Sequence, residues 1–198
     1  MPIKRRERDA AITARGKRHI CATRHFFDFF TGEAAAYRTT KRLREQGYLK
    51  LIGTIVLGES GRPENVYGGW KPPYHLFHHE LKLTDFLLLY PEAETVRGYI
   101  VNRRLKPDAE MTLDGRLFYV ELDTAEETHT QVRRRQSVYA GVQDFVLFVT
   151  SSERRRENLR LNCHEAVKNI ALFATLDDAM KTPHGEIWFD AMGEKTAI

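Results

Sequence analysis

Hydrophobic and polar residues follow two different periods along this 198-residue chain. Helical spacing dominates the first 50 residues and predicts helices over 4–15, 23–30 and 33–46, with Thr23 as an N-cap and Gly47 as a C-cap. The aromatic residues of the second helix are expected in the core. Two runs of β-forming residues follow at 48–57 and 65–67, around a Gly- and Pro-containing tip, and they predict a hairpin. Helix, helix, basic helix and hairpin is the order of a winged helix-turn-helix, which is the fold expected for residues 1–70.

A Gly- and Pro-rich segment at 68–73 predicts a domain boundary, after which the pattern changes. An apolar-periodic helix is expected at 74–90, and strands are expected at 96–102, 105–113, 117–123 and 144–150. Further helices are predicted at 128–141 and 153–171, and late strands at 172–175 and 186–190. Residues 71–198 therefore predict a separate α/β domain with a mixed sheet.

The charge is distributed unevenly. Residues 1–50 hold 13 Lys and Arg against 5 Asp and Glu, a net charge of +8, whereas the remainder has a net charge of −4. A basic module of this kind indicates a polyanionic partner, and the predicted fold favours double-stranded DNA. The expected DNA contacts lie on the third helix and at the hairpin tip, namely Arg38, Lys41, Arg42, Arg44 and Arg62. The alternative is that these side chains form only a solvated face.

No apolar run approaches the length of about 20 residues that a membrane-spanning helix needs. No apolar segment follows the basic N-terminus, so a secretory signal is not expected. These features predict a cytoplasmic protein without a membrane partner.

Three carboxylates of the second half are candidates for chemistry. Asp108 falls in the second strand of the predicted domain, directly after a proline. Glu121 and Asp123 lie two residues apart in the third strand, so both point to the same face of the sheet. A turn at 114–115 pairs the two strands and is expected to bring Asp108 near Glu121. Clustered carboxylates indicate either a divalent cation or a compensating cationic side chain.

The spacing Pro107-Asp108 … Glu121-Leu122-Asp123 resembles that of the PD-(D/E)xK nucleases, a restriction-endonuclease-like fold. From about residue 8 to 150, the chain also resembles the replication-relaxation family of plasmids and integrative elements. That resemblance rests on the order of KRLREQGYL, HHELKLTDFLL, LKPDA and FYVELD, followed by a basic helix that ends at Tyr139.

The resemblance implies that Asp108 and Glu121 bind Mg²⁺ or Mn²⁺, with Glu80 as a further ligand. The position of the nuclease lysine holds Asp123 instead, and Arg135 is the residue expected to supply the missing positive charge. An arginine stabilises a transition-state charge but is a poor general base. Asp108, Glu121, Asp123 and Arg135 are therefore the catalytic candidates, and the alternative is a nuclease fold kept as a scaffold, its carboxylates paired with Arg135 or Arg104.

The favoured function is DNA binding in the replication, mobilisation or control of a mobile element. Two alternatives stay open: a Mg²⁺-dependent DNA endonuclease, and a winged-helix transcription regulator whose α/β domain forms a homodimer or binds a partner. A nuclease assay separates the first two functions, and a footprint over a promoter would favour the third.

Overall fold

In the part of the chain that the structure describes, two separate β-sheets organise the fold, one of three strands and one of seven. The computed structural model describes residues 4–56, 61–97, 105–124 and 128–198. Internal contacts divide the chain into an N-terminal unit, Met1–Asp85, and a C-terminal unit, Phe86–Ile198. The protein is thus of mixed α/β class, as the sequence predicts.

The N-terminal unit combines helices with the smaller sheet. In chain order its elements are α1 (Arg5–Arg18), β1 (Cys21–Ala22), the 3-10 helix η1 (Thr23–Phe29), α2 (Glu33–Glu45), β2 (Leu51–Val56), β3 (Pro63–Tyr67), the 3-10 helix η2 (Tyr74–Leu76) and α3 (Phe77–Leu87). All pairs in this sheet are antiparallel, and the strand order is β1-β3-β2. Gly47 has a φ of +77° and ends α2, because the Tyr48 N–H donates to the Leu43 carbonyl.

Two apolar clusters form the core of this unit. In one of them, residues of α1, η1 and α2 pack together with Tyr67 of β3. In the other, Phe77 and Leu81 of α3 pack on Ile52 and Val66 of the sheet. The division into units consequently falls inside α3, later than the boundary predicted at 70/71. The packing of Phe77 and Leu81 explains the difference, because it holds most of α3 within the N-terminal unit.

One local prediction for this unit is wrong. Thr23 is not an N-cap: Ala22 precedes η1, the element is a 3-10 helix, and Thr23 is fully buried. The aromatic residues of this segment do contribute to the core: Phe26 is fully buried, and Phe29 and Phe30, which are half-buried, pack against the same cluster.

A buried hydrogen-bonded network joins η1 to α3. The Ala22 N–H donates to Nδ1 of His25 at 3.0 Å, so the ring proton lies on Nε2, which is 2.7 Å from Oδ1 of Asp85. Arg24 contacts Asp85 at 3.0 Å and Glu64 of β3 at 3.4 Å. Burial is the main cause that lowers the pKa of His25, although Asp85 opposes it. Burial alone would raise the pKa of Asp85, but His25 and Arg24 outweigh it, and the net shift is downward.

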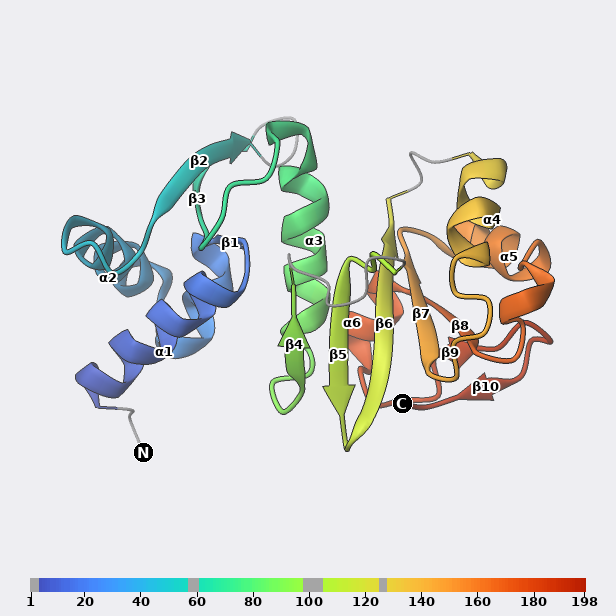
Figure 1. Cartoon of the computed structure of the whole chain (residues 1–198). Helices are drawn as coiled ribbons and strands as arrows, with labels where there is room; N and C mark the ends of the chain where they lie inside the picture. The colour runs from blue at the N-terminus through green and yellow to red at the C-terminus, as the bar shows by residue number, and fades with distance from the viewer. Residues whose placement is uncertain (1–3, 57–60, 98–104, 125–127) are drawn as a thin grey trace. The chain divides into compact units, whose positions relative to one another are not determined.

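The C-terminal unit is built on the seven-stranded sheet. Its elements after α3 are β4 (Glu94–Val96), β5 (Ala109–Leu113), β6 (Arg116–Asp123), α4 (His129–Ser137), β7 (Phe145–Thr150), α5 (Glu153–Leu161), the 3-10 helix η3 (Glu165–Val167), β8 (Ala171–Thr175), α6 (Leu176–Lys181), β9 (Trp188–Phe189) and β10 (Lys195–Thr196). The strand order is β10-β9-β8-β7-β6-β5-β4; the pairs β6–β7 and β7–β8 are parallel, and the other pairs of described strands are antiparallel. The sheet is mixed, as expected, and Figure 1 shows α4 and α5 together on one side of it.

Several boundaries differ from those predicted. α4 ends at Ser137, and the helix expected over 153–171 is instead α5, η3 and the start of β8. β4 begins at Glu94, and most of the strand predicted at 96–102 lies outside the described residues. The turn between β5 and β6 is where the sequence placed it: Asp114 and Gly115 have φ values of +49° and +76°. Positive φ at both central positions is the geometry of a type I′ hairpin turn.

We expect the stability of the N-terminal unit to decrease as the pH falls below about 6.5, the ordinary pKa of histidine. The folded-state pKa of His25 is lower than the unfolded one, so its contribution is fully present above that pH and is lost as the ring is protonated. Urea unfolding between pH 8 and pH 5 measures this. His25→Asn should remove the slope below pH 6.5, whereas His78→Asn, at an exposed position of α3, should retain it. An unchanged slope in His25→Asn would contradict the assignment.

Candidate functional site

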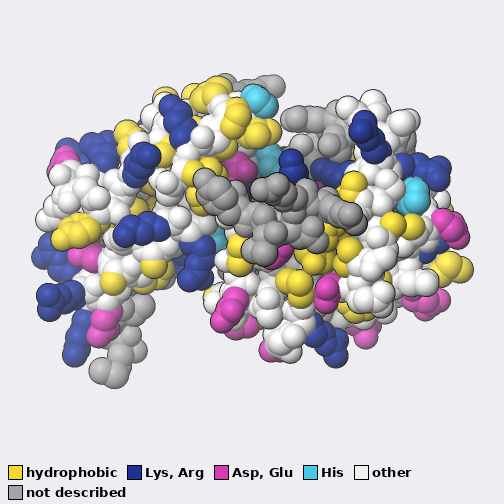
Figure 2. All heavy atoms as spheres, viewed as in Figure 1, with side chains coloured by type: hydrophobic (Ala, Val, Ile, Leu, Met, Phe, Trp, Pro, Cys, Tyr) yellow, Lys and Arg dark blue, Asp and Glu magenta, His cyan; other side chains and the backbone are white. Residues whose placement is uncertain are grey.

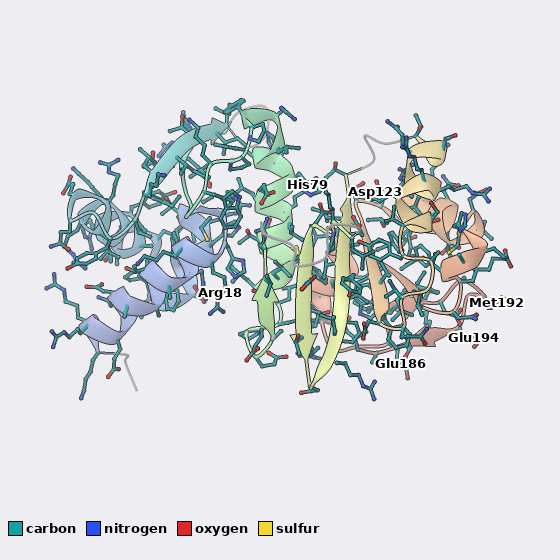
Figure 3. The ribbon with its side chains drawn as sticks, in the orientation of Figure 1. Arg18, His79, Asp123, Glu186, Met192 and Glu194 are labelled. Atoms are coloured by element: carbon teal, nitrogen blue, oxygen red, sulfur yellow. The ribbon has the colours of Figure 1, made fainter. Side chains whose placement is uncertain are left out.

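The candidate site lies on the face of β6 that α4 and α5 cover. Along this strand the alternation places Tyr119, Glu121 and Asp123 on the same face, as the sequence predicts for the two carboxylates. Glu121 is 1% exposed and Asp123 is 3% exposed. Figure 3 shows Asp123 at the end of β6, where the parallel neighbour β7 also ends, at Thr150. Carboxylates this deeply buried require partners, because burial alone disfavours their charged form.

Asp108 approaches this face from the neighbouring chain segment. It lies directly before β5, not within a strand as predicted, because the ladder of β5 and β6 begins at Ala109. Its N–H donates to the Val120 carbonyl at 3.0 Å, and its Oδ2 accepts from the Leu122 N–H at 2.8 Å. The expected proximity of Asp108 to the β6 carboxylates is therefore present, but one of its oxygens binds the β6 backbone.

Glu121 is held by two side chains, one from α4 and one just after it. The Tyr139 hydroxyl donates to Oε1 of Glu121 in a short hydrogen bond, and Nε of Arg135 lies 3.4 Å from Oε2. Burial raises the pKa of Tyr139 well above its ordinary value, and the charges of Glu121 and Asp108 raise it further. Tyr139 thus remains a protonated donor, and a fully buried phenol of this kind is unsuited to act as a nucleophile.

Asp123 pairs with a residue that the sequence analysis did not single out. Arg155, in the first turn of α5, contacts both carboxylate oxygens: its Nε lies 3.1 Å from Oδ1, and its Nη2 lies 2.9 Å from Oδ2. This is the planar, two-point geometry that gives arginine–carboxylate pairs their strength. The positive charge beside Asp123 therefore comes from Arg155, whereas Arg135 is paired with Glu121.

The remaining candidates do not complete a cluster within one unit. Glu80 lies on α3 in the N-terminal unit, whereas Asp108 and Glu121 belong to the C-terminal unit. Arg104 lies outside the described residues. Within the described part of the chain, no three His, Cys, Asp or Glu side chains form a group that could hold a metal ion. Glu121 and Asp123 are bound by protein side chains, and the Mg²⁺ site that the nuclease resemblance implies stays a prediction.

The predicted DNA-binding residues occupy different sides of α2. The buried side of this helix consists of Ala36, Thr40 and Leu43. Arg38 and Lys41 are exposed on the opposite side, and Arg44 is half-buried on one flank. Ala34 and Tyr37 of the same helix are exposed as well.

Arg42 lies on the other flank of α2 and turns toward α1. Its Nη2 contacts Oδ2 of Asp9 at 2.7 Å, and its Nη1 donates to Oε1 of Gln46 at 3.0 Å. Arg42 therefore joins the two helices and is less available to an external partner than Arg38 or Lys41.

Arg62 is exposed directly before β3 and lies on the Tyr37 flank of α2. Burial raises the pKa of Tyr37, the charge of Glu64 raises it further, and that of Arg62 lowers it. The tip of the hairpin itself, residues 57–60, lies outside the described residues.

Comparison with known protein families finds none that matches this chain, and comparison with curated proteins finds no significant match either. Among the described residues, no helix combines the length and apolar character required to cross a membrane.

Tyr139 and Arg155 are the two site residues that sequence reasoning missed. Both stand at helical spacing from a buried apolar residue: Arg155 is four positions before Leu159 on α5, and Tyr139 is seven positions after Val132 of α4. That spacing places both residues on the side of their segments that faces the core. The spacing is the sequence feature from which their inward position could have been predicted.

We expect Arg155→Met to lower the free energy of unfolding by about 3–5 kcal/mol, the typical cost of removing one partner from a buried ion pair. The reason is that Asp123 would keep its charge in a site that is almost inaccessible to water. Arg154→Met, at the exposed neighbouring position, should change stability by only about 0.5 kcal/mol. Chemical denaturation measures both variants.

A double variant, Asp123→Asn with Arg155→Met, should recover part of the loss, because no unpaired charge remains. Equal effects of Arg155→Met and Arg154→Met would show that the pair does not stabilise the C-terminal unit.

Proposed function

We propose that this protein binds duplex DNA through its N-terminal unit, with α2 entering the major groove. The observation that carries the proposal is the division of α2 into two opposite sides. Ala36, Thr40 and Leu43 anchor one side in the core, while Arg38 and Lys41 stand exposed on the other. A helix held rigidly by its apolar side and basic on its outer side is suited to contact phosphates and base edges.

The arrangement around α2 supports a winged-helix assignment. The order of elements is α1, β1, η1, α2 and then the hairpin of β2 and β3, with β1 as the third strand of the sheet. In this interpretation η1 takes the place of the first helix of the helix-turn-helix. Arg62, directly before β3, would contact the DNA backbone beside the groove.

The charge of the unit agrees with such a partner. Residues 1–85 hold 16 Lys and Arg against 9 Asp and Glu, a net charge of +7, and residues 86–198 have a net charge of −3. On the face visible in Figure 2, Lys and Arg side chains are spread over the N-terminal unit. Nonspecific affinity for DNA derives mainly from such phosphate contacts.

We further propose that the C-terminal unit is a nuclease-related scaffold. Within this unit, the order β4-β5-β6-α4-β7 agrees with the three strands, helix and strand expected of that fold, whereas most of the preceding helix α3 belongs to the N-terminal unit. Glu121 and Asp123 have cationic partners in Arg135 and Arg155, which favours structural carboxylates over metal ligands. The resemblance to the replication-relaxation family would place the DNA target in a plasmid or integrative element.

Replacing Arg38 or Lys41 by Gln should weaken DNA binding and reduce its dependence on salt. Each lost phosphate contact lowers the slope of log K against log salt concentration by about 0.9 for duplex DNA. Fluorescence anisotropy of a labelled duplex, titrated at several salt concentrations, measures both quantities. Lys181→Gln, at an exposed position of α6, carries the same charge change and should leave the slope unaltered. If all three variants lost the same DNA affinity, the loss would follow from the change in net charge alone. That result would contradict the proposed role of α2.

The scaffold assignment predicts that supercoiled plasmid stays intact when it is incubated with the protein and Mg²⁺ or Mn²⁺. Agarose gels should show the same topoisomers with metal, with chelator and with the Glu121→Gln variant. Nicked or linear product that requires metal and disappears in Glu121→Gln would contradict the assignment and favour the endonuclease instead.

A further inference from the structure

A pocket of about 510 Å³ opens between α1 and the C-terminal end of α2. α1 contributes one stripe of side chains at helical spacing, and α2 with the residues after it contributes the opposite wall. Figure 1 shows the two helices beside each other within the N-terminal unit, where Arg42 and Asp9 join them.

The interior of this pocket is apolar. Small side chains of α1, namely Ala10 and Ala14, leave the space open, and Leu43 closes it from the core side, where it is 2% exposed. Tyr48, which is 58% exposed, adds an aromatic ring to the wall. A volume of this size and an apolar lining with a few polar groups are typical of small-molecule sites.

The charged groups around the pocket are mainly positive. Arg6, Lys17 and Arg42 line it together with a single acidic residue, Asp9. Asp9 is already bound to Arg42 at 2.7 Å, so the charges of Arg6 and Lys17 are in excess. Their aliphatic stems also extend the apolar surface, while the charged ends stay near water.

We propose that this pocket binds a small apolar carboxylate, such as an aromatic acid. The apolar body of the ligand would lie on Ala10, Ala14 and Leu43 and against the ring of Tyr48. Its carboxylate would lie within reach of the cationic rim. Apolar burial supplies the affinity, and the excess of positive charge selects an anion over a neutral molecule of the same shape.

The site is separate from the proposed DNA-binding side of α2, and it does not depend on that function. Arg42 and Gln46 line the flank of α2 that faces α1, whereas Arg38 and Lys41 do not line the pocket. Binding of a carboxylate can therefore be measured on the full chain without DNA.

The probe is 2-naphthoate, titrated into the full chain by isothermal calorimetry, with 2-naphthamide as its neutral analogue. We expect saturable binding of naphthoate that is about tenfold tighter than that of the amide, the ratio that corresponds to 1.4 kcal/mol of charge-assisted contact. Ala14→Trp fills the pocket from an exposed helix position and should abolish binding. Ala34→Trp introduces the same side chain at an exposed position of α2 outside the pocket and should leave naphthoate binding unchanged.

The same two variants distinguish this proposal from the DNA-binding proposal. Ala34→Trp obstructs the exposed side of α2 and should weaken duplex binding, whereas Ala14→Trp should not. Circular dichroism confirms that both variants fold. The pocket proposal is overturned if naphthoate fails to bind the wild-type chain, if Ala14→Trp binds it normally, or if the amide binds equally well. It is also overturned if Ala14→Trp abolishes self-association in place of naphthoate binding, because the pocket would then be an interface between copies.

Discussion

The burial of two carboxylates on one face of β6 is the constraint on which the C-terminal unit depends. Glu121 and Asp123 are almost inaccessible to water, and a carboxylate in that environment is stable as an anion only when it is paired. Arg135 and Arg155 supply the pairing, one from α4 and the other from α5. The positions of both helices on the sheet are therefore coupled to the charges of one strand. Apolar packing around Phe148 and Phe173 then fills the space between the helices and the sheet.

Much of the fold follows from local patterns, and the errors arise where tertiary contacts override them. The type I′ turn at Asp114 and Gly115 and the end of α2 at Gly47 are fixed by backbone conformations that few residues adopt. By contrast, the segment after Leu161 contains no Gly or Pro to mark the end of α5. The break there is stabilised from outside the segment, since the His164 N–H donates to the Gln136 side chain, 28 positions earlier in the chain. Sequence periodicity carries no information about such a partner.

The candidate site shows the same division between what a pattern determines and what packing determines. Two residues of one strand that are two positions apart lie on the same face of the sheet. The sequence alone therefore predicted that Glu121 and Asp123 share a face. Arg135 was also predicted as a partner of these carboxylates, and it pairs with Glu121. The arginine that reaches Asp123 was not predictable, because three consecutive arginines, at 154–156, stand in the first turn of α5. Their environments differ: residue 154 is exposed, Arg155 binds Asp123, and Arg156 contacts Asp178 and the ring of Phe189. Only the rotation of α5 about its axis decides among them.

In the N-terminal unit, the helix α2 presents three different surfaces. Its circumference divides into a buried side, an exposed basic side and the flank that Arg42 presents to α1. The proposed carboxylate would lie beside the Arg42–Asp9 pair, and the excess charges of Arg6 and Lys17, which line the same pocket, would attract it. Arg38 and Lys41 do not line the pocket, so the proposed ligand and the proposed DNA would contact different sides of the same helix. Because Ala36, Thr40 and Leu43 hold the third side in the core, α2 can present both surfaces at once.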